Sequence, residues 1–405
     1  MIFFVSAGEP SGDIHAAALI RKIRETAPDT VFTGFGGPRM KEAGCILAAD
    51  LTKFAVMWFW HAVKKYFRFR KLLAEARTLF QTKKFDAVIL VDYPGFNWHI
   101  AKAAKEQGIP VIYFMPPQIW AWARWRIKKM RAFVDIILCP IHFEWKWFQQ
   151  QNCKAVFIGH PFFEEIRTKK SDPVFLEQFY TEYGSAPVLT ILAGSRHQEI
   201  SANLDDLLRT VQKIQTQRPD IQPVFAAFNE EQAARIRRRL TVKKMSVPVF
   251  AGRTTELIRA ADCCLAVSGS VSMELLACHK PAVIYYRVCR ISLFIQRFFR
   301  RTKYITLVNL IGAAGTRGQS PFYSDSVRMI PKEPSMQARQ QMFFPEFLTA
   351  ADRSGEAADI LTAWLSQPKL LAWEQRRLET LHTETDTVES PLALAAQNIL
   401  EMSRR

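Results

Sequence analysis

The sequence predicts an α/β fold in which two doubly wound, Rossmann-like domains with parallel sheets face a central cleft, followed by a helical C-terminal tail. Two observations predict this class. Short apolar runs recur along the chain, and each is followed by a turn with Gly, Pro or Ser and then by a segment of helical period. The same alternation then occurs a second time. Since such sheets bind ligands at the carboxyl ends of their strands, we expect the site in the cleft.

The first domain is expected to span residues 1–168. Its predicted strands are the apolar runs at residues 2–7, 87–92, 111–115, 135–140 and 155–161. A polar stretch around residues 169–173 is typical of an interdomain linker.

The second domain is expected to span residues 174–343. Its predicted strands lie at residues 188–196, 222–228, 247–252, 263–270 and 281–288. Residues 312–343 are predicted to form a long inserted loop or lid, because long loops of this kind are commonly functional. Residues 344–405 are expected to be the helical tail, with no further strand.

The chain carries a strong excess of positive charge. It has 55 Lys and Arg against 38 Asp and Glu, which gives a formal net charge of +17. Most of this excess lies in three stretches without any acid, at residues 64–71, 124–131 and 287–303. Because these stretches are also rich in aromatic or large aliphatic residues, they predict an anionic membrane surface as partner in preference to nucleic acid.

Two of the basic stretches project as amphipathic helices, near residues 56–71 and 290–301, with aromatic residues on one side and bases on the other. Such helices can lie in the membrane interface, although the same stripes are common in ordinary protein cores. The residues predicted to contact the membrane are Trp58, Phe59, Trp60, Val63, Phe67, Lys64, Arg68, Lys71, Phe294, Phe298, Arg297 and Arg301.

The cysteines and histidines indicate neither disulfides nor a metal site. Seven Cys are scattered without C-x-x-C spacing, and the eight His show no H-x-x-x-H or H-E-x-x-H pairing. The N-terminus has no signal-peptide pattern, and no run of about 18 apolar residues could span a membrane. We therefore expect a cytoplasmic protein, peripherally associated with the inner face of the cytoplasmic membrane, with no metal and no cofactor.

A polar turn at residues 6–13 separates the first strand from the following helix. Gly8 and Gly12 permit a tight turn and a close approach of the backbone to a ligand. Glu9, Ser11 and Asp13 add more polar groups than a helix start requires, which favours a role in the site. The alternative is a helix start that is capped by Ser11 or Asp13.

Asp92 follows a wholly apolar strand, and the chain must turn directly after it at Pro94 and Gly95. A carboxylate at the carboxyl end of a buried parallel strand points toward the expected cleft. There it could act as a general base, and partial burial would raise its pKa toward neutral pH. The alternative is a turn cap satisfied by nearby N–H groups. Asn97 is either a hydrogen-bonding residue that orients Asp92 or a turn residue.

Two turns in the second domain have the chemistry of a phosphate site. The first contains Ser195 and Arg196, whose backbone N–H groups and guanidinium suit a diphosphate. The alternative is that Arg196 pairs with Glu199 and Ser195 caps the helix.

The second turn contains Ser268, Gly269 and Ser270, with Glu274 in the first turn of the next helix. This Glu either accepts from ribose hydroxyls or only favours the helix dipole. Neither turn has the G-x-x-x-x-G-K-[ST] pattern, which argues for a nucleotide diphosphate donor and against hydrolysis of a nucleoside triphosphate.

Six sequence blocks occur in an order that resembles the lipid-A-disaccharide synthase family. They are SAGEPSGD at residues 6–13, DYPGFN at 92–97, LAGSR-x-x-EI at 192–200, SGS-x-x-ME at 268–274, YYRV at 285–288, and VNL at 308–310 followed by FPEF at 344–347. The resemblance runs from the N-terminus to the final helix, and the first block is specific enough to carry most of the assignment.

The resemblance implies an inverting, metal-independent glycosyltransferase of the GT-B type. Such an enzyme transfers 2,3-diacylglucosamine from UDP-2,3-diacylglucosamine to 2,3-diacylglucosamine 1-phosphate. It forms the β-1,6-linked lipid A disaccharide 1-phosphate and releases UDP, as a step of lipid A biosynthesis for lipopolysaccharide. The implied partners are these two substrates and the membrane, without nucleic acid, and a homodimer is left open.

The resemblance also implies roles for individual residues. Asp92 is the expected base, while Glu9, Ser11 and Asp13 line the acceptor side or hold the loop of Asp92. Arg196 is placed to neutralise the leaving diphosphate. The residues predicted to bind substrate are Gly8, Gly12, Asn97, Ser195, Arg196, Glu199, Gly269, Ser270, Met273, Glu274, Arg287 and Asn309.

The sequence departs from the family pattern at several positions. Pro10 and Ala193 replace the usual Ala and Pro, and Ser270 stands in a turn that usually contains Thr. The inserted loop separates Asn309 from Pro345, where the family has a short spacer, which puts the geometry of Asn309 in question.

Three other functions compete with this interpretation. A UDP-sugar epimerase or another GT-B glycosyltransferase would use the same two-domain scaffold, and a noncatalytic protein would bind lipid or nucleic acid. An epimerase leaves the aromatic basic helices without a purpose, whereas a noncatalytic protein predicts that Asp92→Asn leaves function intact.

Overall fold

The computed structural model describes residues 1–52, 62–267, 269, 271–315, 317–324, 326–327, 329–330 and 334–404. Four predicted site residues, Trp58, Phe59, Trp60 and Ser270, lie outside the described residues. The side chains of Val63 and Lys64 also lie outside them, since only the backbone of that part of α4 is described.

The described chain divides into two compact units. The first contains Met1–Glu164 and Thr387–Arg405, and the second contains Glu165–Asp386. The domain limits expected from the sequence, 1–168, 174–343 and 344–405, remain a prediction.

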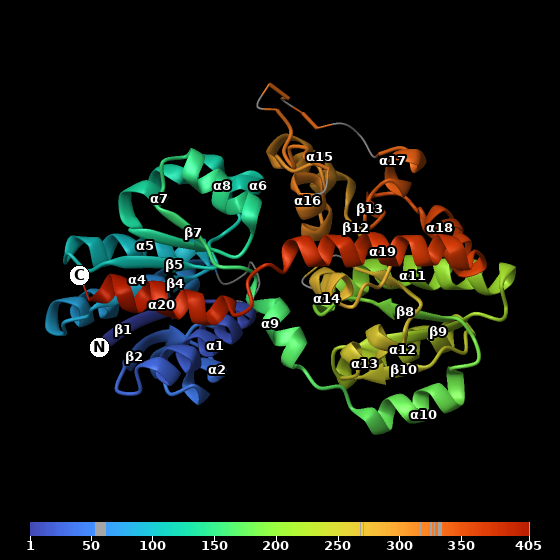
Figure 1. Ribbon diagram of the computed structural model, residues 1–405, viewed down its shortest axis with the longest axis horizontal. Helices are drawn as coiled ribbons and strands as arrows, with labels where there is room; N and C mark the ends of the chain where they lie inside the picture. The colour runs from blue at the N-terminus through green and yellow to red at the C-terminus, as the bar shows by residue number, and fades with distance from the viewer. Residues whose placement is uncertain are drawn as a thin grey trace. The chain divides into compact units, whose positions relative to one another are not determined.

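The first unit is built on a seven-stranded parallel sheet (Figure 1). Its strands are β1 (Ile2–Ala7), β2 (Val31–Gly36), β3 (Ile46–Asp50), β4 (Ala87–Val91), β5 (Val111–Phe114), β6 (Ile136–Cys139) and β7 (Ala155–Phe157). Their order in the sheet is β3-β2-β1-β4-β5-β6-β7, so the direction of winding reverses between β1 and β4. The segments that follow β1 and β4 therefore lie at the point where doubly wound sheets bind ligands.

Helices cover this sheet, and the last helix of the chain is among them. The helices are α1 (Pro10–Thr26), α2 (Pro38–Glu42), α4 (Ala62–Thr82), α5 (Pro94–Glu106), α6 (Ile119–Trp122), η2 (Arg124–Arg126), α7 (Ile127–Phe133), α8 (His142–Gln150) and α20 (Pro391–Ser403). The chain passes from the first unit to the second within α9 (Pro161–Thr168). Helix α20 lies beside α1, and its Ile399 is buried in the same core as Phe3 and Ile20 (Figure 1). Part of the expected tail thus completes the first unit.

The second unit is built on a six-stranded parallel sheet with the order β10-β9-β8-β11-β12-β13. Its strands are β8 (Val188–Leu192), β9 (Gln222–Ala227), β10 (Val249–Ala251), β11 (Cys263–Ala266), β12 (Ala282–Arg287) and β13 (Glu346–Thr349). Its helices are α10 (Pro173–Tyr183), α11 (His197–Gln217), α12 (Glu230–Val242), α13 (Thr254–Ala260), α14 (Val271–Ala277), α15 (Arg290–Phe299), α16 (Leu307–Ala314), α17 (Met336–Gln340), α18 (Ser354–Ser366) and α19 (Pro368–Thr385). The winding reverses between β8 and β11.

The predicted class, an α/β fold with two doubly wound parallel sheets, is confirmed. One expectation about the tail was wrong, because Glu346–Thr349 form the edge strand β13, paired in parallel with β12. The strands β2 and β3 were also not foreseen. None of the helices in the described ranges is long and apolar enough to cross a membrane.

Candidate functional site

Asp92 stands directly after β4, beside the turn that follows β1. The backbone of Asp92 and Tyr93 takes the left-handed conformation, with φ of 41° and 48°. Residues other than Gly adopt this region at some cost, and Asp tolerates it better than most. The turn therefore holds Asp92 in a fixed and unusual orientation at the carboxyl edge of the sheet.

Two buried side chains hold the carbonyl group of Asp92. Asn97 donates from Nδ2 to the Asp92 carbonyl at 2.8 Å and accepts at Oδ1 from Ser6 Oγ at 2.7 Å, so it joins the ends of β4 and β1. Tyr113 donates from its hydroxyl to the same carbonyl at 2.6 Å. Both bonds go to the backbone carbonyl of Asp92, so they do not involve its carboxylate oxygens. Asn97 thus orients Asp92 by hydrogen bonding, which is the first of the two interpretations drawn from the sequence.

The electrostatics of Asp92 suit a base near neutral pH. Burial, and after it the negative charge of Glu9, raise the pKa of Asp92 to about 6, against a smaller lowering by the N–H of Tyr93. Glu9 is the N-cap residue of α1, and it is half-buried. The structure therefore brings together Glu9 and Asp92, which the sequence separates by more than eighty positions.

Gly8 contacts the aromatic ring that follows Asp92. A Cβ atom at Gly8 would lie 2.0 Å from Cδ1 of Tyr93, so no larger residue fits without moving that ring. On another side, Tyr93 meets Phe69 of α4 edge to face, with 6.4 Å between the ring centroids. The close approach of Tyr93 explains why the first glycine of the block is needed. The contact between Tyr93 and Phe69 links α4 to the turn of Asp92.

Asp13, another polar residue of the first block, has structural partners. Asp13 is buried and accepts from the backbone N–H groups of Gly37 at 2.8 Å, Arg39 at 3.0 Å and Met40 at 3.0 Å. Among the described residues, its hydrogen bonds all go to the start of α2, and none goes to Asp92. Gly12 is buried on α1, and Ser11 is exposed there. The alternative that Ser11 or Asp13 caps α1 is wrong, because the helix begins at Pro10 and Glu9 is its N-cap residue.

In the second unit, Glu199 occupies the turn that was expected to bind phosphate. Its Oε2 accepts from the backbone N–H groups of Ser195 at 3.2 Å and Arg196 at 3.1 Å. Its Oε1 accepts from the Arg196 guanidinium at 3.2 Å. Gly194 permits this turn with φ of 100°. The structure thus has the alternative pairing of Arg196 with Glu199, although Arg196, and not Ser195, is the N-cap of α11.

The second turn follows β11, the neighbour of β8. Glu274 is buried and accepts from Thr255 Oγ1 at 2.6 Å, and Lys169 Nζ lies 3.8 Å from the same carboxylate oxygen. Met273 is buried beside it, whereas Gly269 is exposed at the tip of the turn. The contact with Thr255 holds α14 on α13.

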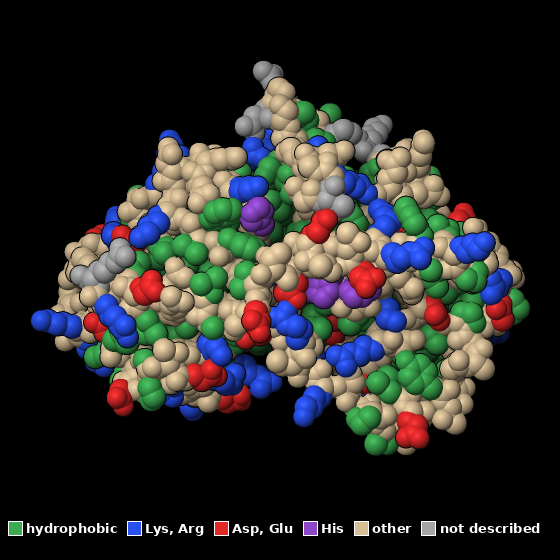
Figure 2. All heavy atoms as spheres, viewed as in Figure 1, with side chains coloured by type: hydrophobic (Ala, Val, Ile, Leu, Met, Phe, Trp, Pro, Cys, Tyr) green, Lys and Arg blue, Asp and Glu red, His purple; other side chains and the backbone are tan. Residues whose placement is uncertain are grey.

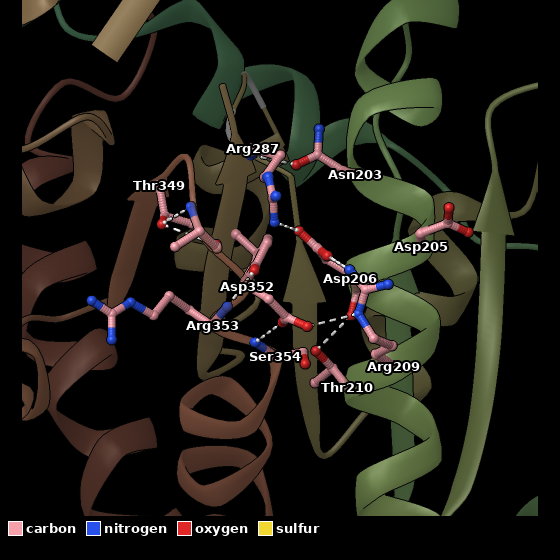
Figure 3. Close-up of polar contacts among 12 residues, drawn as sticks. Asn203, Asp205, Asp206, Arg209, Thr210, Arg287, Thr349, Asp352, Arg353 and Ser354 are labelled. Atoms are coloured by element: carbon pink, nitrogen blue, oxygen red, sulfur yellow. Dashed lines mark hydrogen bonds and ion pairs between the residues drawn. The ribbon is translucent and has the colours of Figure 1, made fainter. Parts of the chain in front are cut away.

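Arg287, at the end of β12, belongs to an ionic network with α11 (Figure 3). Its Nη1 lies 2.8 Å from a carboxylate oxygen of Asp206, and its backbone N–H donates to Asn203 Oδ1 at 2.7 Å. Arg209 also binds Asp206, and its Nε lies 2.9 Å from Asp352. Figure 3 shows Arg287 directed toward α11, so the network fixes the end of β12 on that helix.

Asn309 is buried on α16 and binds the start of β13, although more than thirty residues of the chain lie between them. Its Nδ2 donates to the Phe344 carbonyl at 2.6 Å and to Glu346 Oε1 at 2.8 Å, and its Oδ1 accepts from the Phe344 N–H at 3.0 Å. Glu346 also accepts from the backbone N–H groups of Ile305 and Thr306, each at 2.8 Å. Asn309 and Glu346 are therefore in direct contact.

Comparisons with known proteins agree with the order of these blocks. The profile of the family described as Lipid-A-disaccharide synthetase matches residues 3–317. The chain belongs to this family. It is 32% identical over 313 residues to the lipid-A-disaccharide synthase of Myxococcus xanthus, which covers 77% of this chain and 81% of that protein. The corresponding protein of Nitrosococcus oceani is 32% identical over 317 residues, or 77% of this chain and 80% of that protein.

Solved structures support the fold of this lipid-A-disaccharide synthetase family member. The glycotransferase of kitacinnamycin aligns with a TM-score of 0.59 and 13% identity, over 99% of this chain and 98% of that chain. A UDP-GlcNAc 2-epimerase from Neisseria meningitidis, bound to UDP-GlcNAc, aligns with a TM-score of 0.57 and 10% identity, over 99% and 98% of the two chains. At this identity the likeness shows the GT-B-like fold alone, so it does not favour the epimerase alternative.

The amphipathic helix expected near residues 290–301 exists in this family member as α15, with its apolar side exposed. Ile291, Phe294 and Phe298 are 73%, 55% and 41% exposed. The two predicted cationic residues do not extend freely. Arg297 donates from Nε to the Ile330 carbonyl at 3.0 Å, and Arg301 donates to the Val327 carbonyl at 2.8 Å.

The other basic residues form no single patch on the face shown in Figure 2, where Lys and Arg side chains are spread over both units with Asp and Glu among them. On α4, the predicted residues Phe67, Arg68 and Lys71 are exposed. The net charge of +17 therefore does not by itself indicate one membrane-binding surface, and each basic stretch is considered separately.

Two side chains of the first unit that interact with Asp92, those of Tyr113 and Glu144, were not predicted from the sequence. Tyr113 is buried inside β5, where only its hydroxyl distinguishes it from a core residue. Glu144 stands in an aromatic stretch on α8 and is also buried. An acid among aromatic residues was the available signal for Glu144. Within the described ranges, no group of three or more His, Cys, Asp or Glu could hold a metal ion.

Proposed function

We propose that this protein is a lipid-A-disaccharide synthase that transfers 2,3-diacylglucosamine from UDP-2,3-diacylglucosamine to the 6-hydroxyl of 2,3-diacylglucosamine 1-phosphate. It acts as an inverting glycosyltransferase without a metal. The observation that carries the proposal is membership of the family together with an Asp of raised pKa, Asp92, at the winding reversal of the first sheet. We assign the acceptor to the domain expected at residues 1–168 and the donor to that at 174–343.

In the proposed reaction, Asp92 acts as the general base. Its carboxylate takes the proton of the acceptor 6-hydroxyl as the oxygen attacks the anomeric carbon of the donor. The new carbon–oxygen bond forms as the bond from that carbon to the diphosphate breaks, so the configuration inverts and UDP leaves with the bonding electron pair. The pKa of about 6 leaves Asp92 largely ionised near neutral pH while keeping it a stronger base than an exposed Asp.

The leaving diphosphate needs positive charge in the second unit. We assign this role to Arg196 and to the backbone N–H groups at the start of α11, where the Glu199 carboxylate is bound. That carboxylate occupies the donors that a phosphate oxygen would use, which supports an anion site at this turn. Binding of the diphosphate then requires the Glu199 side chain to move.

The Arg196→Ala variant is expected to bind UDP at least about tenfold more weakly, because a charge-assisted contact to phosphate is lost. The Arg196 side chain is 76% exposed, so the substitution removes little packing. Calorimetric titration with UDP measures the affinity. Arg218→Ala, at the other end of α11, is the matched control and should bind UDP normally. Unchanged UDP affinity in Arg196→Ala would remove this residue from the donor site.

The substrates carry acyl chains, so we propose that the protein works at the inner face of the cytoplasmic membrane. The exposed apolar side of α15 and the basic helix α4 are the proposed contacts, and α4 touches the turn of Asp92 through Phe69. A homodimer is compatible with this arrangement and is not required by it.

Substituting Phe294 and Phe298 together by Ser is expected to reduce binding to vesicles of anionic phospholipid at least about tenfold, because two large apolar side chains no longer enter the interface. Co-sedimentation measures the binding. The control substitutes Val174 and Tyr180 by Ser; these residues are 59% and 50% exposed on α10 (Figure 1). Equal loss in both double variants would show that α15 has no special role.

The direct test of the proposed function is incubation of the folded protein with the two lipid precursors. Release of UDP together with a disaccharide 1-phosphate supports the proposal. Interconversion of a UDP-sugar without any lipid acceptor would instead support an epimerase, and the absence of both reactions would reject an enzymatic function.

A further inference from the structure

Glu144 is a buried carboxyl group that the proposed mechanism does not use. It lies in the first turn of α8, shortly after β6, and is 1% exposed. Its Oε1 accepts from the indole Nε1 of Trp120, a fully buried residue of α6, at 2.7 Å. Its other oxygen, Oε2, is buried and has no hydrogen-bond partner among the described residues. A carboxyl group in this state requires a physical explanation.

Burial of this kind favours the neutral acid over the anion. An ionised carboxylate without a counter-ion is costly to bury, and no ion pair in the described part of the chain includes Glu144. Burial, and then the charge of Asp92, raise the pKa of Glu144 to about 8, although the bond from Trp120 lowers it. The other titratable group beside it is the Cys139 thiol on β6, whose pKa burial raises well above the ordinary value.

The position of Glu144 relates it to Asp92. The strands β4, β5 and β6 are neighbours in the sheet, and the segments after them are joined by backbone hydrogen bonds. Asp92 donates its N–H to the Met115 carbonyl, and Met115 donates its N–H to the Leu138 carbonyl, each at 3.2 Å. At about 4.8 Å between strands, the two carboxyl groups follow strands that are about 10 Å apart. Two charges at this buried edge would repel each other.

Trp120 connects Glu144 to the segment between β5 and α7. Its ring meets Phe143 edge to face with 5.1 Å between the centroids, so both α6 and α8 contribute to the contact. The same short helix carries Trp122, which has the Arg126 guanidinium 4.8 Å from its ring centroid. Loss of the bond between Trp120 and Glu144 would take an acceptor from a buried indole N–H group and loosen this segment.

We propose that Glu144 is a positioning residue of the Asp92 site: its neutral carboxyl group fixes α6 through Trp120 and adds no further negative charge near Asp92 at this edge of the sheet. The inference rests on the proposed function, in which Asp92 is the base. It predicts that a neutral residue of the same shape can replace Glu144, and that ionisation of Glu144 is harmful.

The test compares Glu144→Gln with the parent protein in the transfer reaction with both lipid substrates. Gln keeps an acceptor for the Trp120 indole and is neutral at every pH. Near pH 7 its kcat/KM should be within about threefold of the parent value. Above about pH 8, the parent should lose activity as Glu144 ionises, whereas Glu144→Gln should retain it.

Glu144→Ala removes the acceptor for the indole. It is expected to raise the KM for the acceptor substrate at least about tenfold with unchanged affinity for UDP, which binds in the other unit. Restoration of KM in Glu144→Gln separates positioning from the charge. If Glu144→Ala does not fold, the comparison of Glu144→Gln with the parent decides alone.

The pH dependence of the stability tests whether Glu144 is protonated, and it does not require an activity assay. The native state binds the proton of Glu144 more tightly than the unfolded state, so its contribution to stability is complete below about pH 4.5 and is lost as the pH rises toward about 8. The urea midpoint of Glu144→Gln should therefore rise relative to that of the parent over this interval. Glu106→Gln, an exposed position at the end of α5, is the matched control and should show no such trend.

The outcomes distinguish this inference from the proposed function. A parent protein that transfers no sugar rejects the proposed function, and this inference with it. A parent protein with full activity, together with identical pH profiles and midpoints for Glu144→Gln, overturns the inference alone. A Glu144→Gln variant that loses activity near pH 7 also overturns it, because a charged carboxylate would then be required.

Discussion

The Asp92→Asn variant is expected to turn over at least about 100-fold more slowly than the parent protein, with unchanged affinity for UDP. Asn has the size of Asp and tolerates the left-handed backbone of this position, but it cannot take a proton from the acceptor hydroxyl. The bonds from Asn97 and Tyr113 reach the Asp92 carbonyl and are kept. Initial rates of disaccharide formation and a UDP titration measure the two quantities.

Asp86 supplies a matched control on the same strand. It lies just before β4, at the opposite end from Asp92, and accepts from the Ile2 N–H at 2.6 Å. Asp86→Asn should leave turnover within about twofold, since an amide oxygen can accept the same bond. Full turnover in Asp92→Asn would reject Asp92 as the base, and a large loss of unfolding free energy would instead mark a structural cap.

The pH dependence of the parent protein provides a second measure of the same residue. Because the pKa of Asp92 is raised to about 6, kcat/KM should fall as the pH decreases through this value and the base becomes protonated. Stability should change in the opposite sense. The native state binds the proton of Asp92 more tightly than the unfolded state does. The protonated Asp92 therefore contributes to the free energy of unfolding below about pH 4, and this contribution is lost as the pH rises through about 6. Asp92→Asn removes both dependences.

The family resemblance implied that Glu9 lines the acceptor side or holds the loop of Asp92, but it did not predict that the charge of Glu9 acts on Asp92. The order of strands was not available from periodicity, so the adjacency of β1 and β4 required the structure. The strand β13 was missed for a related reason. Four residues after a long loop carry too little pattern to distinguish a strand, and pairing with β12 determines their conformation.

Residue type alone did not show whether a polar side chain near a strand end binds a ligand or another part of the protein. Asp13, Glu199 and Arg287 are all polar residues near strand ends, as a binding site requires. Each of them binds a group of the protein: the start of α2, the start of α11, and Asp206. The partners of Asp13 and Arg287 come from other elements, so spacing along the chain does not reveal them. Glu199 binds the start of its own helix, which its spacing from Arg196 had offered as an alternative. Glu144 shows the reverse case, in which an acid without a complete set of partners gave only a faint sequence signal.

Asn309→Ala is expected to destabilise the protein by about 3 kcal/mol, because it leaves the buried N–H and carbonyl of Phe344 without partners. UDP affinity should fall together with stability, since the side chain holds β13 on α16. A side chain that only contacts UDP would lose affinity at constant stability. Urea unfolding and a UDP titration on the same samples distinguish the two cases.

A double-mutant cycle with Glu346→Gln determines whether the contact across the inserted loop is the cause. Asn309 Nδ2 donates to Glu346 Oε1 at 2.8 Å, so the two substitutions should couple by about 1–3 kcal/mol. Asn229→Ala is the calibrating control, because it removes one helix cap, a bond from the Gln232 N–H at 3.0 Å, and should cost about 1 kcal/mol without coupling. Additive effects of Asn309→Ala and Glu346→Gln would mean that the two residues act separately. A coupling in the expected range would instead make the junction of α16 and β13 one structural element, held together although the chain between Ala314 and Glu346 is long.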